Sequence, residues 1–420
     1  MSRARNFKLV AAVILAATLS GPPVRAELPG YNSGILAQLM GDAASDRFGR
    51  FVHDFWPEAH RAGISRRVYD MAFRGVGPDP SVLELAQEQP EFKTPIGDYF
   101  GKRVTPERIA AGRDMAQSHA ETLDRIERRY GVDREILLAI WGMESNYGSH
   151  KGEMSVIRSL ATLAYVGKRR SFGRSQLVAA LKILQRGDIS AADFTGSWAG
   201  AMGHTQFIPT TYNAYAVDWT GDGRRDIWNS IEDALASTAN YLARSGWQRG
   251  LKWGYEVRLP TRFDQRLIGE QARRSLASWA RLGVRPTVGQ GFGAGDATAY
   301  LVQPAGSSGP AFLVTRNFDA VKSYNPAAAY ALAIVHLGDR IRGDGPFVQQ
   351  FPGGERAPTL AELQEIQRRL TAQGFNTGGA DGRVGRDTMV AVRDFQRKVG
   401  INPADGYAGL KVLARLRQMP

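Results

Sequence analysis

Hydrophobic residues recur three and four positions apart from about residue 31 to 250, in runs such as "ILAQLM", "RVYDMAF", "LDRIERRY" and "LVAALKIL". This spacing places apolar side chains on one face of a helix, and Gly or Pro separates the runs. Between about 251 and 316 the pattern changes to the short strand candidates "WGYEVRLP", "ATAYLVQP" and "PAFLVT", and the last two flank the turn "AGSSG". We therefore predict a mainly helical region with a small β insertion.

Helical spacing returns in "NPAAAYALAIVHLGDRI", where we expect Asn325 to be the N-cap and Pro326 the first helical residue. Residues 343–357 are rich in Gly and Pro and are interpreted as an interdomain linker. In the segment that follows, Asp-Gly-x-x-Gly precedes a helical run twice, at Asp381 and at Asp405. Together with the run "LQEIQRRLTAQGF", these repeats predict a C-terminal bundle of three helices.

The first 26 residues combine a basic start, an apolar run of about ten residues and a small residue at Ala26, which is typical of a secretory signal peptide. A membrane anchor is the alternative, but the apolar run is shorter than the ~18 residues that a spanning helix needs. The sequence has no cysteine. A lipid-anchored lipoprotein is thereby excluded, and we expect a periplasmic protein with no stable membrane anchor.

The formal net charge is +13, and Arg3, Arg5, Lys8 and Arg25 of the predicted signal contribute four of these charges, which leaves +9. An exported basic protein meets anionic polymers. Nucleic acid is the usual partner of a basic protein, but the rest of the chain shows neither a recognition motif nor a basic run. Peptidoglycan, which carries carboxylates, fits better.

One glutamate ends an unusually apolar helical run. The run "REILLAIWGMES" follows a capping candidate, Asp133, and is broken by "NYG", so Glu144 falls in the last helical turn. Leu137, Ile140 and Trp141 share its face. Burial and the negative end of the helix both raise the pKa of such a carboxyl, which suits it to protonating a glycosidic oxygen. The alternative is a structural glutamate paired with an arginine.

A second informative stretch is "GSWAGAMGHTQFIPTTY", residues 196–212. Its small residues let a ligand approach the backbone, and Ser197 and Gln206 offer hydrogen bonds suited to hydroxyl and N-acetyl groups. This composition is typical of a sugar site, although a tight turn between packed helices would have it too. We interpret His204 as a surface or packing residue rather than a base.

These motifs, with "ALASTANYL" and "SYNPAAAYALAIVHL", resemble in order and spacing the membrane-bound lytic transglycosylase B family of lysozyme-like murein-degrading enzymes. The stretches "QEQPEF" and "GPAFLVTRNFDAVKSYN" are similar as well. The C-terminal segment resembles the "DGxxGxxT" type of peptidoglycan-binding domain. The resemblance implies a signal peptide (1–26), a mainly α, lysozyme-like catalytic region (27–342), a linker (343–357) and a three-helix peptidoglycan-binding domain (358–420).

The resemblance also implies a reaction. Glu144 would protonate the oxygen between N-acetylmuramic acid and N-acetylglucosamine, then deprotonate the C6 hydroxyl of the muramyl residue, which closes a 1,6-anhydro ring without water. The N-acetyl group can assist, so a second carboxylate is not needed as nucleophile. The alternatives are a hydrolytic muramidase of the same fold and a non-catalytic wall-binding protein, which would be expected to lack the acid.

Further site residues follow from the same resemblance. Family positions that contact substrate correspond to Ser197, Gln206, Tyr241, Tyr324, Asn325 and Tyr330. Of these, Tyr241 and Tyr330 also fit a purely structural role in the core. The expected partners are peptidoglycan glycan strands and other cell-wall enzymes, the expected state is a monomer, and no nucleic acid is expected.

The stretch "VDWTGDGRRDIWNSIED" begins like a calcium loop, with Asp218, Thr220 and Asp222 at positions one, three and five. Family members carry such a site, with a late acidic ligand best matched by Asp233. Threonine at position three and Asn229 at position twelve depart from the pattern. A structural calcium ion is one interpretation and a Gly-rich turn is the other; no cofactor is required for the reaction.

Overall fold

The computed structural model describes residues 42–86, 95–293, 296–352, 356 and 358–419. The predicted signal peptide lies outside these residues. Two compact units are present and are treated separately: the first comprises the described residues 42–86 and 111–241, and the second comprises 95–110 and 242–419. Among the described residues, no helix combines the length and the apolar character that a membrane crossing requires.

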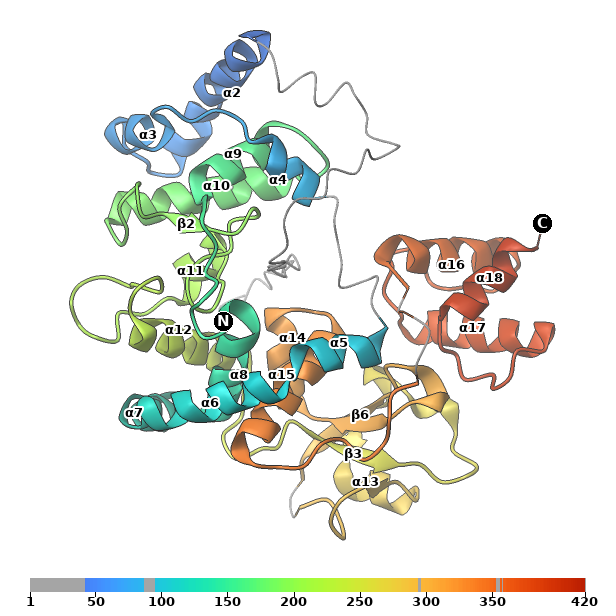
Figure 1. The fold of residues 1–420 in the computed structure, drawn as a ribbon. Coiled ribbons are helices and arrows are strands. Elements are labelled where there is room, and N and C mark those ends of the chain that lie inside the picture. Colours follow the sequence, from blue (N-terminus) through green and yellow to red (C-terminus); the bar gives the residue numbers. More distant parts are fainter. Residues whose placement is uncertain (1–41, 87–94, 294–295, 353–355, 357, 420) are drawn as a thin grey trace, which may run out of the picture. The chain divides into compact units, whose positions relative to one another are not determined.

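The first unit is built from helices, as the spacing of apolar residues predicts (Figure 1). A two-stranded antiparallel ribbon, β1 (Met154–Ser155) with β2 (Thr195–Gly196), is its one departure from helix and loop in the described part. Its helices are α2 (Asp42–Arg61), α3 (Arg66–Phe73), α4 (Pro80–Leu85), α7 (Ala120–Tyr130), α8 (Arg134–Ser145), α9 (Val156–Tyr165), α10 (Arg170–Arg186), α11 (Pro209–Tyr215) and most of α12 (Ile231–Arg244). Helix α6 (Pro106–Ser118) and the end of α12 cross the division between the units.

Local sequence fixes both ends of α8, the helix that carries Glu144. Gly131 ends α7 in the left-handed conformation with φ 70°, and Asp133 is the extended residue before α8. Asn146 and Tyr147 then adopt φ values of 48° and 57°, which no helix can continue. Glu144 therefore lies in the last turn of α8, as predicted.

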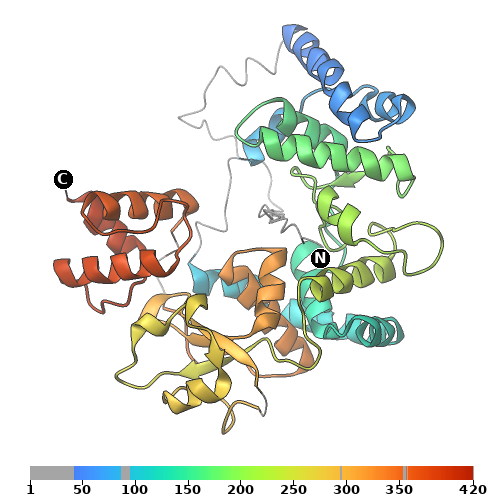
Figure 2. The same ribbon diagram turned by 180° about the vertical axis from the view of Figure 1, so that it is seen from behind.

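The second unit contains a five-stranded antiparallel sheet in the order β4-β6-β7-β3-β5. Strands β3 (Gly254–Arg258), β6 (Thr298–Val302) and β7 (Ala311–Val314) confirm the predicted β insertion. The short strands β4 (Arg274–Ser275) and β5 (Arg285–Pro286) have only two residues each, which is too few to show alternation. Helix α13 (Leu276–Arg281) lies beside strand β3 (Figure 1), as the same ribbon seen from behind also shows (Figure 2). Its fully buried Trp279 shares a core with Val257 of β3 and Leu313 of β7.

Three more helices of this unit are α5 (Ile96–Arg103), α14 (Arg316–Tyr324) and α15 (Ala328–Arg342). The predicted start of α15 was wrong. Asn325 is instead the residue that ends α14, and its Oδ1 accepts a hydrogen bond from the backbone N of Ala327 at 3.0 Å. That side-chain turn separates the two helices, so α15 begins two residues after Pro326.

Residues 343–352, the first ten of the fifteen residues of the predicted linker, pack closely against the rest of their unit. The Phe347 ring stacks on His336 with centroids 3.8 Å apart, and the Phe351 ring contacts Phe100 at 4.8 Å. The carboxylate of Glu256 accepts hydrogen bonds from the backbone N atoms of residues 348 and 349 at 2.8 and 2.7 Å. Aromatic contacts and one carboxylate thus hold residues 343–352 in place, and we call this segment the strap.

The C-terminal segment folds as the predicted three-helix bundle, with α16 (Leu360–Ala372), α17 (Arg386–Val399) and α18 (Leu410–Arg417). Thr359 and Glu362 form a reciprocal capping box that starts α16. Small apolar and aromatic side chains from all three helices share one core, which includes Ile366, Leu370, Val392, Phe395, Val412 and Leu413.

Candidate active site

The end of α8 holds Glu144 in a buried, mostly apolar setting. Glu144 is only 8% exposed and Trp141, one turn earlier, is 1% exposed. The ring of Tyr147 lies edge-on to Trp141 and fills the space above Gly142, where a Cβ would come within 2.6 Å of the tyrosine ring. The sequence "WGMESNY" therefore builds a small aromatic wall beside the glutamate.

His204 connects this helix end to the glycine-rich loop. The indole N–H of Trp141 donates to Nδ1 of His204 at 3.0 Å, and the hydroxyl of Ser145 donates to the His204 carbonyl at 2.6 Å. Burial, and then the positive charge of Lys151, lowers the pKa of His204 to about 4. The imidazole is therefore neutral near pH 7 and can accept the indole proton. We conclude that His204 positions the helix that carries Glu144.

The loop packs closely against α9 and against the segment around Ile227 because its glycines lack side chains. A Cβ on Gly203 would lie 2.3 Å from the carbonyl oxygen of Ile227, and one on Gly200 would lie 2.8 Å from Leu160. Both glycines also have positive φ, 68° and 79°. Ser197, 7% exposed, closes the turn by accepting a hydrogen bond from the backbone N of Ala201 at 3.0 Å.

Gln206 has an unusual conformation and one unused acceptor. Its φ is 53°, and its Nε2 donates to the carbonyl oxygens of Lys151 and Gly203, both at 2.9 Å. Its Oε1 is buried and, among the described residues, has no hydrogen-bond donor. Because a buried carbonyl oxygen without a donor is costly, this atom is suited to receive an N–H or O–H from a bound sugar.

The other predicted substrate residues divide between the two units. Tyr241 belongs to the first unit, is 9% exposed, and packs its ring against Phe207 and Tyr215. Tyr324, Asn325 and Tyr330 belong to the second unit, whereas Glu144 belongs to the first. Tyr330 is only 1% exposed, so its ring is part of the core of that unit. A substrate role for these four residues stays a prediction.

The predicted calcium loop is closed by its own hydrogen bonds. The carboxylate of Asp218 accepts from the backbone N atoms of residues 221, 222 and 223 at 2.6, 3.2 and 2.8 Å, and from the hydroxyl of Thr220 at 3.3 Å. Asp233 accepts from three further backbone N atoms, and the Asp222 carboxylate pairs with Arg224. In the described part of the chain, no three acidic or histidine side chains converge as a metal site. This arrangement does not fit a calcium cage.

The structure makes the interpretation of His204 more specific and adds one residue, Lys151. His204 was interpreted as a surface or packing residue rather than a base, and it is a buried packing residue that bonds to α8. Lys151 was not considered; its Nζ donates to the carbonyl of Trp228 at 2.5 Å, which ties the segment after α8 to the loop before α12. Neither role shows in the sequence, because both depend on contacts between residues more than 60 positions apart.

A buried glutamate at the end of a helix that bonds to a glycine-rich loop, where a buried amide oxygen has no donor among the described residues, is an arrangement suited to acid catalysis on a sugar. The sequence matches the transglycosylase SLT domain family over residues 47–339, and a peptidoglycan binding domain family over residues 359–416. The chain belongs to the membrane-bound lytic transglycosylase B family and carries a C-terminal peptidoglycan-binding domain.

Particular relatives agree with this assignment. The chain is 30% identical over 319 residues to membrane-bound lytic murein transglycosylase B of Escherichia coli, covering 72% of this chain and 85% of that protein. It is 48% identical to SltB3 of Pseudomonas aeruginosa, solved with NAG-anhNAM-pentapeptide, with a TM-score of 0.83 over 88% of this chain and 99% of that chain. The E. coli transglycosylase Slt35 in complex with calcium is 25% identical, with a TM-score of 0.58 over 72% of this chain and 95% of that chain.

Proposed function

We propose that this protein cleaves the β-1,4 bond between N-acetylmuramic acid and N-acetylglucosamine in peptidoglycan and leaves 1,6-anhydro ends. Family membership over most of the chain supports the enzyme class. The NAG-anhNAM-pentapeptide bound in the crystal structure of the Pseudomonas relative, which contains an anhydro sugar, supports the chemistry. The observation that carries the assignment to a residue is the burial of Glu144 in the last turn of α8, the helix end that bonds to the loop containing Gln206 through Ser145 and His204.

Glu144 acts first as an acid and then as a base. Its carboxyl proton passes to the glycosidic oxygen as the bond to C1 of the muramyl residue breaks. The same carboxylate then takes the proton of the muramyl C6 hydroxyl, whose oxygen attacks C1 and closes the anhydro ring. The net change is the cleavage of one C–O bond and the formation of another, with no water consumed. The neutral His204 holds the helix end in place and takes no proton itself.

Gln206 and Ser197 bind and orient the sugar. The buried Oε1 of Gln206 accepts a hydrogen bond from an acetamido N–H or a hydroxyl of the substrate. Two hydrogen bonds already hold the Gln206 side chain in position before the sugar binds. Binding therefore costs little conformational entropy of this side chain.

A hydrolytic muramidase of the same fold is the alternative, and the products distinguish the two. We expect mass spectrometry of soluble products from purified peptidoglycan to show muropeptides lighter by one water and resistant to borohydride. Glu144→Gln should abolish them, whereas Glu121→Gln, a change at an exposed position of α7, should not. Reducible ends from the wild type would identify a hydrolase. Normal release of anhydro products by Glu144→Gln would remove Glu144 from the mechanism.

Location and partners follow from the substrate. Because peptidoglycan lies outside the cytoplasm, we propose that the predicted signal peptide delivers the protein to the periplasm, where it acts as a monomer on glycan strands and in company with other cell-wall enzymes. The E. coli relative Slt35 was solved in complex with calcium. For this chain we propose a reaction that requires no cofactor.

A further inference from the structure

The C-terminal domain contains the same turn twice. Asp381 and Asp405 are each followed by a glycine with positive φ, 76° and 79°. The glycine that caps the following helix has φ −86° in both turns. The glycines of the two turns therefore share one backbone conformation. A group that binds to one turn indicates what kind of group the other turn can bind.

A buried glutamine clasps each aspartate in the same way. In the first turn, Nε2 of Gln367 donates to Oδ1 of Asp381 at 3.3 Å, and its Oε1 accepts from the next backbone N at 2.7 Å. In the second turn, Gln396 makes the same two bonds around Asp405 at 3.0 and 2.8 Å. The backbone N two residues after each aspartate also donates to Oδ1, at 2.8 and 2.9 Å. Oδ1 is thus engaged within the turn, which leaves Oδ2 for an outside donor.

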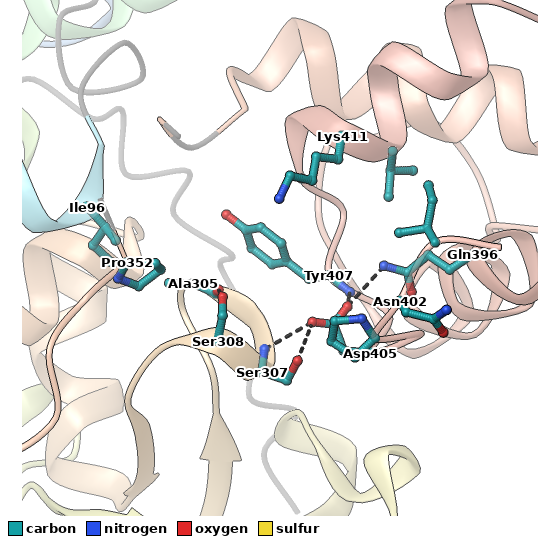
Figure 3. A pocket seen from close by; sticks show the side chains of 14 residues that line it. Ile96, Ala305, Ser307, Ser308, Pro352, Gln396, Asn402, Asp405, Tyr407 and Lys411 are labelled. Atoms are coloured by element: carbon teal, nitrogen blue, oxygen red, sulfur yellow. Dashed lines mark hydrogen bonds between the residues drawn. The ribbon is translucent and has the colours of Figure 1, made fainter. Parts of the chain in front are cut away.

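In the second turn, a segment of the β insertion supplies that donor. Oδ2 of Asp405 accepts from both the backbone N and the hydroxyl of Ser307, each at 3.0 Å (Figure 3). The preceding Gly306 fits against the same carboxylate, because a Cβ there would lie 2.8 Å from Oδ2 and 3.2 Å from Tyr407. A cavity of about 160 Å³ adjoins this contact. The turn thus binds an acylated N–H and a hydroxyl on adjacent carbons.

In the first turn, Oδ2 accepts no hydrogen bond from another described residue, and Asp381 is exposed. The backbone N–H of Arg383 holds the pKa of Asp381 below its usual value, so the carboxylate is charged near pH 7. Hydrogen bonds to a charged acceptor are stronger than those between neutral groups. The first turn therefore presents Oδ2 of Asp381 to solvent as an oriented acceptor. The matching atom of the second turn, Oδ2 of Asp405, accepts the two hydrogen bonds from Ser307.

The Ser307 donors have a counterpart in the cell-wall glycan. In N-acetylglucosamine an acetamido N–H at C2 stands next to a hydroxyl at C3, so the sugar is also an acylated amine with a hydroxyl on the adjacent carbon. In N-acetylmuramic acid, O3 is blocked by the lactyl ether. We propose that the Asp381 turn is a glycan-binding site that accepts the acetamido N–H and the 3-hydroxyl of N-acetylglucosamine. This proposal rests on the proposed function, since it supposes that the domain meets wall glycan.

The experiment follows the backbone N–H signals of residues 382 and 383 in the ¹⁵N-labelled full-length protein. Three probes are compared. Methyl β-N-acetylglucosaminide has both donors, its 3-O-methyl ether lacks the 3-hydroxyl donor, and methyl β-glucoside lacks the acetamido N–H. We expect the first probe to shift both signals at concentrations about tenfold lower than the other two, as loss of one charge-assisted bond implies. Asp381→Asn should weaken the response about tenfold, because Oδ2 becomes a donor, while the exposed Asp394→Asn on α17 should leave it unchanged.

Three results would overturn the proposal: equal responses to all three sugars, a response that survives Asp381→Asn, or saturation by N-acetylserine methylamide at lower concentration than by the sugar. The last would show that the turn binds peptide segments. Release of anhydro muropeptides by the wild type is measured on the same preparation. If release is normal and the sugar gives no response, this proposal alone fails; if no anhydro products form, the proposed function fails.

Discussion

Replacing His204 tests whether a neutral imidazole supports the catalytic helix. His204→Leu removes the acceptor for the Trp141 indole, which is 1% exposed, and leaves its N–H buried without that partner. A buried donor that loses its partner costs about 1–3 kcal/mol. Near pH 7.5 His204 is neutral in both the folded and the unfolded chain. We therefore expect the leucine variant to be less stable than the wild type by about 1–3 kcal/mol at that pH.

Lower pH should remove most of this difference. The pKa of His204 falls from 6.5 in the unfolded chain to about 4 in the folded protein, so the unfolded chain binds more protons between these values. The stabilising contribution is complete above pH 6.5 and is lost as the pH falls toward 4. At pH 5 the wild type loses about 2 kcal/mol through this one group. The leucine variant escapes that loss, so the two proteins should become almost equally stable.

The measurement is the free energy of unfolding from urea titrations at pH 7.5, 6 and 5. His53→Leu serves as the control for replacing an exposed imidazole by leucine, because the side chain of His53 is 86% exposed. His204→Asn, which keeps an acceptor near the indole, should lie between wild type and leucine at pH 7.5. Parallel pH curves for wild type and His204→Leu would refute the argument, because they would show that His204 is not the group that titrates.

Two further predictions concern other buried groups. Burial raises the pKa of Asp339 to about 6, so the folded protein binds more protons than the unfolded chain from pH 3.8 upward and stability falls as pH rises through that window. Asp339→Asn, which keeps an acceptor for Trp253, should raise the unfolding free energy at pH 7 by up to about 3 kcal/mol, with almost no gain near pH 4; equal gains at both would contradict it. Gly203→Ala should destabilise by about 2 kcal/mol or more beyond Gly221→Ala, measured by urea titration. Both glycines have positive φ, but a Cβ meets the Ile227 carbonyl only at Gly203, so equal losses would exclude the clash as the cause.

The periodic features were predictable from the sequence, and the contacts between distant segments were not. Helix α8, the three longer strands and the terminal bundle follow from spacing and turn residues. The start of α15 was misplaced because Asn325 uses its side chain to bond its own backbone two residues on, which competes with capping a helix. The role of His204 depends on Trp141, 63 positions away, and no local pattern encodes that pairing. Gln206 was identified from its family position, but only the structure reveals its unused oxygen.

The strap determines where the chain can be divided. A catalytic fragment ending at residue 342 follows the sequence boundary, yet it would lack Phe347 and Phe351. The faces of Phe100, Phe312 and His336 that these rings cover would then meet water, and such a fragment would be prone to associate through them. A fragment that ends after Pro352 retains its own cover. Any exchange of wall-binding domains between relatives should therefore treat residues 343–352 as part of the catalytic half.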